Sequence, residues 1–193
     1  MTIPHNLPDY KERYFETKAF DRIHGKPTLP QIIKIFRQLK RNAQQIQTRL
    51  GGGKHGYLAL LLYTAKYNTL TGTTPFIRPV DPGIFTPTNI VTTPAATGVA
   101  TRTAAAAAAP AATLRSPNSA ELAQQKATYD DNLRLFLEVE TVETILRNQL
   151  LSAFDDDYIQ ALRDTNDMIN LSIPDIMKYL VNFYGQIKPE QLR

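Results

Sequence analysis

The stretch between residues 129 and 185 decides the fold of this chain. Residues 129–153 read YDDNLRLFLEVETVETILRNQLLSA, and residues 172–185 read SIPDIMKYLVNFYG. In the first segment, apolar residues recur mostly at three- and four-residue steps, the spacing that places side chains on one face of a helix. They are Leu133, Phe136, Leu137, Ile145, Leu146, Leu150 and Ala153. We therefore expect a long helix over residues 118–153.

Two shorter helices are predicted after it. One covers about Asp156–Arg163. The next begins after Ser172, because Ser172 and Asp175 form a Ser-x-x-Asp capping pattern. Gly185 is expected to end that helix as a left-handed residue. Its expected buried stripe consists of Ile173, Ile176, Met177, Leu180, Val181 and Tyr184.

The front half of the chain carries a fourth helix. Thr28–Gln31 is a capping box with a proline near its start, where the missing N–H costs nothing. Gly51–Gly53 is predicted to end this helix. Its apolar stripe is Ile32, Ile35, Phe36, Leu39, Ala43, Ile46 and Leu50. Residues 57–70 favour one more helix, although a buried strand at 57–63 has the same pattern. In the helical interpretation Leu58, Leu61, Leu62, Ala65 and Leu70 face inward.

The composition changes between Thr71 and Pro117, where proline, alanine and threonine dominate. We predict a long exposed loop there, disordered over residues 86–117. Phe76, Ile77 and Phe85 are expected to dock the start of the loop on the core. With five or six helices around this loop, the fold class is predicted to be all-α.

Charge is distributed unevenly along the chain. Residues 1–70 hold 12 Lys and Arg against 4 Asp and Glu, whereas residues 119–193 hold 7 against 13. Glu138, Glu140 and Glu143 are placed on the polar side of the long helix. The basic half can bind nucleic acid, the two halves can attract each other within or between copies, or the charges can simply be solvated.

The candidate nucleic-acid-binding residues lie on the front helix and the turn after it. They are Lys34, Arg37, Lys40, Arg41, Arg49 and Lys54. Residues 1–27 form a basic N-terminal arm in which aromatic and cationic residues alternate. Such an arm can contact RNA by stacking and phosphate binding, or it can pack its aromatic residues on the domain or on a neighbouring subunit.

Sequence-local signs of catalysis and metal binding are lacking. The chain has no cysteine, which excludes disulfides and thiolate zinc ligands within it. Residues 51–56 read GGGKHG and follow a helix, so they do not fit a phosphate-binding loop. Asp155–Asp157 are adjacent, and successive side chains on a helix start point apart. We therefore predict no enzyme, no cofactor, no metal site and no small-molecule substrate.

A membrane segment is not expected either. The longest apolar run, Tyr57–Tyr63, is far shorter than the roughly 20 residues that a bilayer span needs. The first residues, Met1–Pro8, lack the charged and apolar regions of a signal peptide. The sequence thus predicts a soluble, intracellular protein.

The order of these features resembles the capsid region of Gag polyproteins from copia-type LTR retrotransposons. In that family an acidic helix leads into an Asp-rich turn, a short Tyr/Ala-Leu helix and a capped helix ending in Tyr-Gly, and then into a turn and a (Pro/Ser)-Glu-x-Leu motif. The matching residues here are Asp155–Tyr158, Ala161–Leu162, Ile173–Gly185 and Pro189–Leu192. Gly51–Leu58 and Thr74–Pro79 look like a variant found in algal elements. The resemblance covers about Thr28–Leu192 without the middle loop.

The resemblance implies a capsid-like helical domain over residues 28–193, equivalent to an N-terminal capsid lobe. It implies a structural protein that self-associates into cytoplasmic virus-like particles and packages RNA. The alternative is a helical module that binds nucleic acid or protein without assembling. In the family a second capsid lobe follows at the position of Lys188–Arg193, so we expect a fragment, a truncated element or a host-captured copy.

Overall fold

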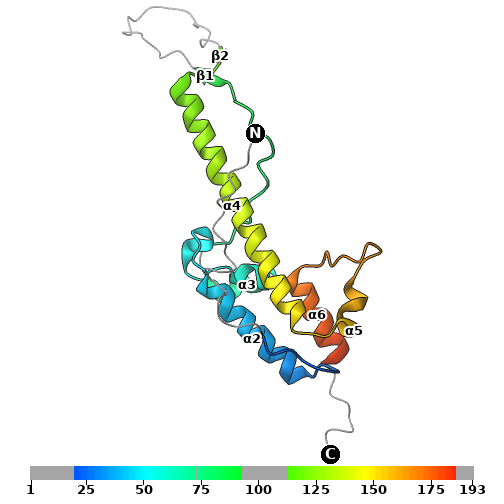
Figure 1. Ribbon diagram of the computed structural model, residues 1–193. Helices are drawn as coiled ribbons and strands as arrows, with labels where there is room; N and C mark the ends of the chain where they lie inside the picture. The colour runs from blue at the N-terminus through cyan, green and yellow to red at the C-terminus, as the bar shows by residue number, and fades with distance from the viewer. Residues whose placement is uncertain (1–19, 73, 93–112, 186–193) are drawn as a thin grey trace, which may run out of the picture. The chain divides into compact units, whose positions relative to one another are not determined.

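The computed structural model describes residues 20–72, 74–92 and 113–185, and within them the chain is mainly helical (Figure 1). The elements are α2 (Leu29–Gln45), η1 (Leu50–Gly53), η2 (Leu58–Leu61), α3 (Thr64–Thr71), β1 (Ile90–Thr92), β2 (Thr113–Arg115), α4 (Ser119–Ser152), α5 (Asp156–Ile159), η3 (Gln160–Leu162) and α6 (Ile173–Tyr184), where η marks a 3₁₀ turn. This helical content confirms the predicted fold class at the level of mainly α, with one small strand pair added.

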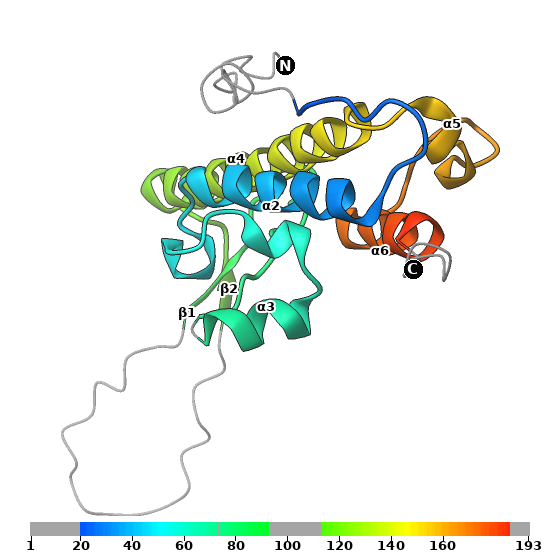
Figure 2. The same cartoon turned by 90° about the horizontal axis from the view of Figure 1, so that it is seen from below.

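The chain divides into two compact units. Unit 1 comprises Met1–Arg78 and Leu137–Arg193, and unit 2 comprises Pro79–Phe136, so α4 contributes to both. In unit 1, α2, the second half of α4 and α6 surround one apolar core, and Figure 2 shows these helices from a second side. The fully buried side chains include Ile32 and Leu39 from α2, Leu146 and Leu150 from α4, and Ile176 and Leu180 from α6.

Helix α4 begins where its cap predicts. The Asn118 side chain accepts from the Glu121 amide at 2.9 Å, and the Glu121 carboxylate accepts from the Asn118 amide at 2.8 Å. This reciprocal pair satisfies two free amides of the first turn. The apolar stripe buries Val142, Leu146 and Leu150. Glu143 lies on that side too and is 6% exposed, so its predicted place on the polar face is wrong.

Helix α6 also begins as predicted, because the Ser172 hydroxyl accepts from the Asp175 amide. Two details of the prediction are wrong. Val181 is 39% exposed instead of buried. Gly185 has a φ of −82°, which is right-handed, and its amide donates to the Val181 carbonyl at 2.8 Å. The glycine permits close approach: a Cβ there would lie 2.3 Å from that carbonyl oxygen and 3.1 Å from Leu29 Cδ1.

The capping box at Thr28 and Gln31 opens α2 as predicted. The helix ends at Gln45, however, and not at the glycine run. The chain returns to the helix end, where the Tyr57 amide donates to the Ala43 carbonyl at 2.8 Å. Gly56 sits so close that a Cβ would lie 2.5 Å from the same oxygen. A carbonyl at the end of α2 is therefore satisfied by a segment that follows more than ten residues later.

Residues 57–71 form two elements, η2 and α3, instead of the predicted single helix or strand. The break lies at Leu62 and Tyr63, whose backbones are extended. Leu58, Leu61 and Leu62 are buried as predicted, but Ala65 and Leu70 are exposed. After the break, Tyr67 points inward instead and packs with Leu58 and Leu62. The predicted Asp156–Arg163 helix is likewise shorter, since α5 passes into η3 at Gln160.

Unit 2 contains the strand pair. β1 and β2 are antiparallel, with Ile90 opposite Arg115 and Thr92 opposite Thr113. The prediction of disorder over residues 86–117 is therefore wrong at both described ends, because backbone pairing between distant residues orders them. Residues 93–112 lie outside the described part. Of the three predicted docking residues, Phe76 packs on the unit 1 core as predicted, whereas Ile77 is 73% exposed and Phe85 packs on Tyr129.

Part of the predicted N-terminal arm belongs to the core of unit 1. Phe20 and Ile23 are 8% and 6% exposed, and the Ile23 amide donates to the Ala153 carbonyl at 2.8 Å. The Arg22 guanidinium lies 2.9 Å from the Asp155 carboxylate. This end of the arm packs on the domain, while residues 1–19 lie outside the described part.

Candidate nucleic-acid interface

A long part of unit 1 carries positive charge without negative charge in the sequence. Between Asp21 and Asp81 there are many Lys and Arg residues and no Asp or Glu. Helix α2 lies within this stretch and turns one apolar face to the core. Because a helix advances about 100° per residue, the cations Lys34, Arg37 and Arg41 project from the opposite side. All three are exposed.

The predicted residues on α2 differ in their surroundings. The Lys34 ammonium lies 3.2 Å from the Asp21 carboxylate, and both side chains are well exposed, at 64% and 83%. An ion pair of this kind contributes little to stability. Among the described residues, Arg37, Lys40 and Arg41 have no carboxylate at ion-pair distance. Within the described part of the chain, no acidic side chain neutralises these three cations.

Lys40 is half-buried and held at a defined place. Its ammonium lies 4.6 Å from the centroid of the Phe36 ring, within cation–π range. Burial lowers the pKa of Lys40, and the positive charge of Lys66 lowers it further. Lys66 is an exposed residue of α3, so two helices bring like charges close enough to repel. An anion beside both ammonium groups would remove that repulsion.

Lys66 was missed at the sequence level. It lies 26 positions after Lys40, in a segment where the apolar pattern alone was informative. Its exposure beside Tyr67, which is buried, is the consequence of the break before α3. The excess of cations over anions in residues 1–70 is the sequence signal that could have added Lys66 to the candidate residues.

Arg49 and Lys54 are separated from the helical group. Both are exposed and flank η1, beyond the end of α2. The structure thus divides the six predicted residues into four on α2 and two on the following turn. The four on α2, together with Lys66, are called the α2 basic face below.

A second cluster of charged residues lies where α4 enters unit 1. The Arg78 guanidinium is 2.5 Å from both the Glu140 and the Glu143 carboxylates, and Arg147 is 3.0 Å from Glu143. Burial alone would lower the pKa of Arg78, but the bonds and charges of the two glutamates outweigh it and raise this pKa. Two guanidiniums face two carboxylates, so the cluster is balanced. Its ion pairs connect the segment after α3 to α4, and its balanced charges would not attract a charged ligand.

A cavity of about 250 Å³ lies beside this cluster, lined in part by Tyr67, Phe76 and Glu143. The Tyr67 hydroxyl is buried and has no hydrogen-bond partner among the described residues. Burial raises the pKa of this hydroxyl, so it stays neutral. The walls are mostly aromatic and aliphatic, and nothing in them resembles a nucleophile with its base.

The three adjacent aspartates diverge. Asp155 caps α5 and accepts from the Gly25 amide at 3.1 Å and from Arg22, and these contacts, the amide first, lower its pKa. Asp156 pairs with Arg163 at 3.2 Å, and Asp157 is exposed. Across residues 20–72, 74–92 and 113–185, no three His, Asp or Glu side chains are arranged to hold a metal ion.

None of the helices in the described ranges combines the length and the apolar character needed to cross a bilayer. The chain has no significant match among protein-family models, curated proteins or solved structures. What it does has to be inferred from its own residues.

Proposed function

We propose that this chain is a capsid-like structural protein that self-associates into cytoplasmic particles and binds RNA through the α2 basic face. The order of sequence features that resembles copia-type Gag capsid regions motivates the assembly part of this proposal. The α2 basic face motivates the RNA part. No catalytic role is included in it.

The observation that carries the RNA part is that, among the described residues, only Lys34 of this face has a carboxylate at ion-pair distance. Within the described part of the chain, Arg37, Lys40 and Arg41 meet no carboxylate, and Lys66 adds a further cation beside Lys40. A polyanion that replaces its condensed counterions with these cations gains free energy from the released ions. Arginine can hold a phosphate with two parallel N–H bonds, whereas lysine acts as a point charge.

The same face predicts binding without sequence preference. Phosphate contacts set the position of a protein on nucleic acid, and bases are read by other contacts. Besides its cations, the α2 face carries the half-buried Phe36 and exposed glutamines, which include Gln44 and Gln45. We expect single-stranded RNA to bind with strong salt dependence and weak discrimination among sequences.

Self-association would strengthen this binding. Weak contacts between copies become effective when many copies share one RNA, because each bound copy raises the local concentration of the next. The competing function is a helical module that binds nucleic acid or protein and stays monomeric. The α2 basic face is complete within one copy, and that feature is compatible with this alternative.

Two measurements test the proposal. Fluorescence anisotropy with a labelled single-stranded RNA at about 50–200 mM salt should give a binding constant that falls steeply as salt rises. The variant R37A/K40A/R41A should weaken binding by about tenfold or more at the low end of this range. K34A removes one cation of the same face and should weaken binding less, because Lys34 already pairs with Asp21.

Light scattering across protein concentration tests assembly. Mass that grows with concentration and with added RNA supports the capsid-like role. A monomer at every concentration, with or without RNA, would refute it and leave the binding module. An RNA affinity unchanged in R37A/K40A/R41A would refute the assignment of the α2 basic face.

A further inference from the structure

The cavity of about 250 Å³ described above has a buried side and an exposed side. All of its lining residues belong to unit 1. Leu62, Tyr67 and Glu143 form its buried side, at 7%, 2% and 6% exposed. Tyr63 and Thr64 also line it and are exposed. The cavity is therefore open to solvent on one side and holds a buried carboxylate on the other.

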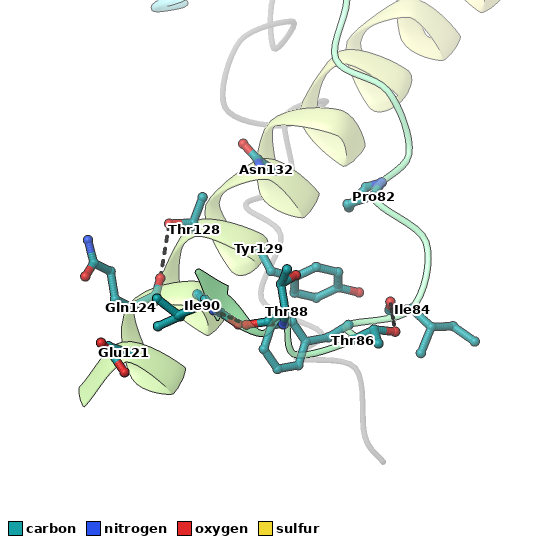
Figure 3. A pocket seen from close by; sticks show the side chains of 12 residues that line it. Pro82, Ile84, Thr86, Thr88, Ile90, Glu121, Gln124, Thr128, Tyr129 and Asn132 are labelled. Carbon is teal, nitrogen blue, oxygen red and sulfur yellow. Dashed lines mark hydrogen bonds between the residues drawn. The ribbon is translucent and has the colours of Figure 1, made fainter. Parts of the chain in front are cut away.

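A groove of unit 2 is larger but lacks such a buried group. Figure 3 shows it between α4 and the segment that precedes β1, and its volume is about 530 Å³. Among the described residues that line it, Glu121 is the only charged one, and its carboxylate already pairs with Arg115. Gln124, Thr128 and Asn132 of its wall are exposed. Of these two hollows, the unit 1 cavity is the one that encloses polar groups away from solvent.

Glu143 and Arg78, which both line the unit 1 cavity, keep hydrogen-bonding capacity. A carboxylate can accept about four hydrogen bonds, and Glu143 meets one guanidinium at each oxygen, Arg147 at 3.0 Å and Arg78 at 2.5 Å. Within the described part of the chain, Arg78 contacts Glu140 and Glu143 through Nη2, so the hydrogens on its Nε and Nη1 remain for an acceptor. Acceptors and donors thus lie side by side with balanced charge, which suits an uncharged ligand that has both.

The aromatic walls of the cavity suit a planar ligand. The rings of Tyr67 and Phe76 have centroids 6.3 Å apart and planes at 76° to each other. A flat ring that stacks on one of them presents its edge to the other, and both arrangements are favourable between aromatic rings. The cavity volume equals about eight waters of liquid, which accommodates one nucleic-acid base without its sugar and phosphate.

The cavity also adjoins the α2 basic face. Phe36 packs against the apolar cluster that contains Tyr67, and the Lys40 ammonium lies 4.6 Å from the centroid of the Phe36 ring. Lys66 directly precedes Tyr67 on α3. A phosphate held by Lys40 and Lys66 would keep its own base close to the cavity, because one ribose joins the base and the phosphate of a nucleotide.

We propose that this cavity binds a guanine base of an RNA strand whose phosphates lie on the α2 basic face. The inference rests on the RNA part of the proposed function and adds to it a preference at single bases. Among the four RNA bases, guanine alone presents two adjacent N–H donors, at N1 and N2, next to an acceptor oxygen, O6. The two donors match the two oxygens of Glu143, and O6 matches the guanidinium of Arg78.

Inosine provides a matched test, because it differs from guanosine only in lacking the N2 amino group. Two labelled RNAs of about 12 nucleotides, one alternating guanosine with uridine and one alternating inosine with uridine, carry the same phosphates. Fluorescence anisotropy should show that the wild-type protein binds the guanosine RNA at least about threefold more tightly. A lost base contact costs about fivefold or more, and the ratio is smaller because only every second register of the repeat carries guanine.

Two neighbouring positions on α3 supply the variants. Thr64 lines the cavity, whereas Ala65 is exposed and lies outside its wall. T64W should obstruct the cavity and bring the affinity ratio of the two RNAs to about one, while A65W should keep the wild-type ratio. E143Q removes an acceptor directly, but its expected loss of stability makes T64W the deciding variant. Circular dichroism checks that the variants keep their helical content.

Equal affinity of the wild-type protein for the two RNAs would overturn the inference while RNA binding by the α2 basic face stands. If free guanosine nevertheless bound, the cavity would serve a free nucleoside and not a base of RNA. A ratio that persists in T64W would also overturn the inference, because the preference would then arise outside the cavity. If neither RNA binds, the RNA part of the proposed function fails together with this inference.

Discussion

Replacing Glu143 with glutamine should destabilise unit 1 through two arginines at once. Glu143 is 6% exposed and pairs with Arg147 at 3.0 Å and with Arg78 at 2.5 Å. The Arg147 side chain is 27% exposed, and its Nε has no partner among the described residues. E143Q leaves this guanidinium without a countercharge in a largely dry place.

The cost follows from the burial of each partner. Breaking a buried pair by removing one member costs about 3–5 kcal/mol. Arg78 is half-exposed and keeps Glu140, so its share is small. We expect E143Q to lose about 2–3 kcal/mol, which lowers Tm by roughly 5–10 °C in a chain of this size. Thermal and urea unfolding followed by circular dichroism measure both quantities.

E140Q is the matched control, because Glu140 is 45% exposed and, among the described residues, forms an ion pair with Arg78 alone. It should cost less than about 1 kcal/mol. The variant E143L/R147L, which removes the pair together, should recover much of the loss. If E143Q and E140Q unfold within about 0.5 kcal/mol of each other, a precision within reach of unfolding curves, the reasoning about Arg147 is refuted.

Three further outcomes are expected. In urea unfolding, G51A should cost about 2–4 kcal/mol, because Gly51 has a φ of +58° and a Cβ there would lie 2.7 Å from the Tyr67 hydroxyl oxygen. The control G72A should cost about 1 kcal/mol, because Gly72 has a similar φ of +57° but a Cβ there would meet nothing within 4 Å. Equal losses would contradict the clash with Tyr67. The Arg115 and Asn118 contacts lower the pKa of Glu121 from 4.5 to about 2, so the cap of α4 stabilises the fold above about pH 4.5 and loses that contribution as the pH falls toward 2. The stability difference between wild type and E121Q should therefore shrink over this window, and a constant difference would exclude the cap as its source. R37A/K40A/R41A should reduce the magnitude of the slope of log K against log salt concentration for RNA binding by about 2, because each phosphate neutralised on single-stranded RNA adds about 0.7 to it. A slope like that of K34A would contradict phosphate binding by these three residues.

Helix starts could be predicted well because their causes are local. The boxes at Thr28–Gln31 and Ser172–Asp175 act within one turn, and the structure forms both. The long α4 matches its predicted span within a residue at either end. Helix ends were harder, since α2 stops where Gly56 and Tyr57 return to its last turn. The end of α2 therefore depends on contacts with residues 56 and 57, and the pattern of apolar residues within the helix cannot predict those contacts.

The candidate RNA-binding site was predictable in part for the same reason. The outward placement of Lys34, Arg37 and Arg41 follows from helical periodicity and the apolar stripe. Lys66 lies near Lys40 because the chain is extended at Tyr63 and then begins the new helix α3. Glu143 is buried because Arg78 and Arg147 both pair with it. A pattern of apolar and polar residues counts every glutamate as polar, so it cannot predict that a glutamate paired with two arginines is buried.

By itself, the sequence determined the mainly helical class, the helix starts and the side of α2 that carries positive charge, because each depends on residues within a turn or two of one another. The tertiary structure decided where α2 ends, that β1 pairs with β2, and that Glu143 is buried against Arg78. These features depend on contacts between residues far apart in the chain, and their free energies arise only when folding has brought those residues together.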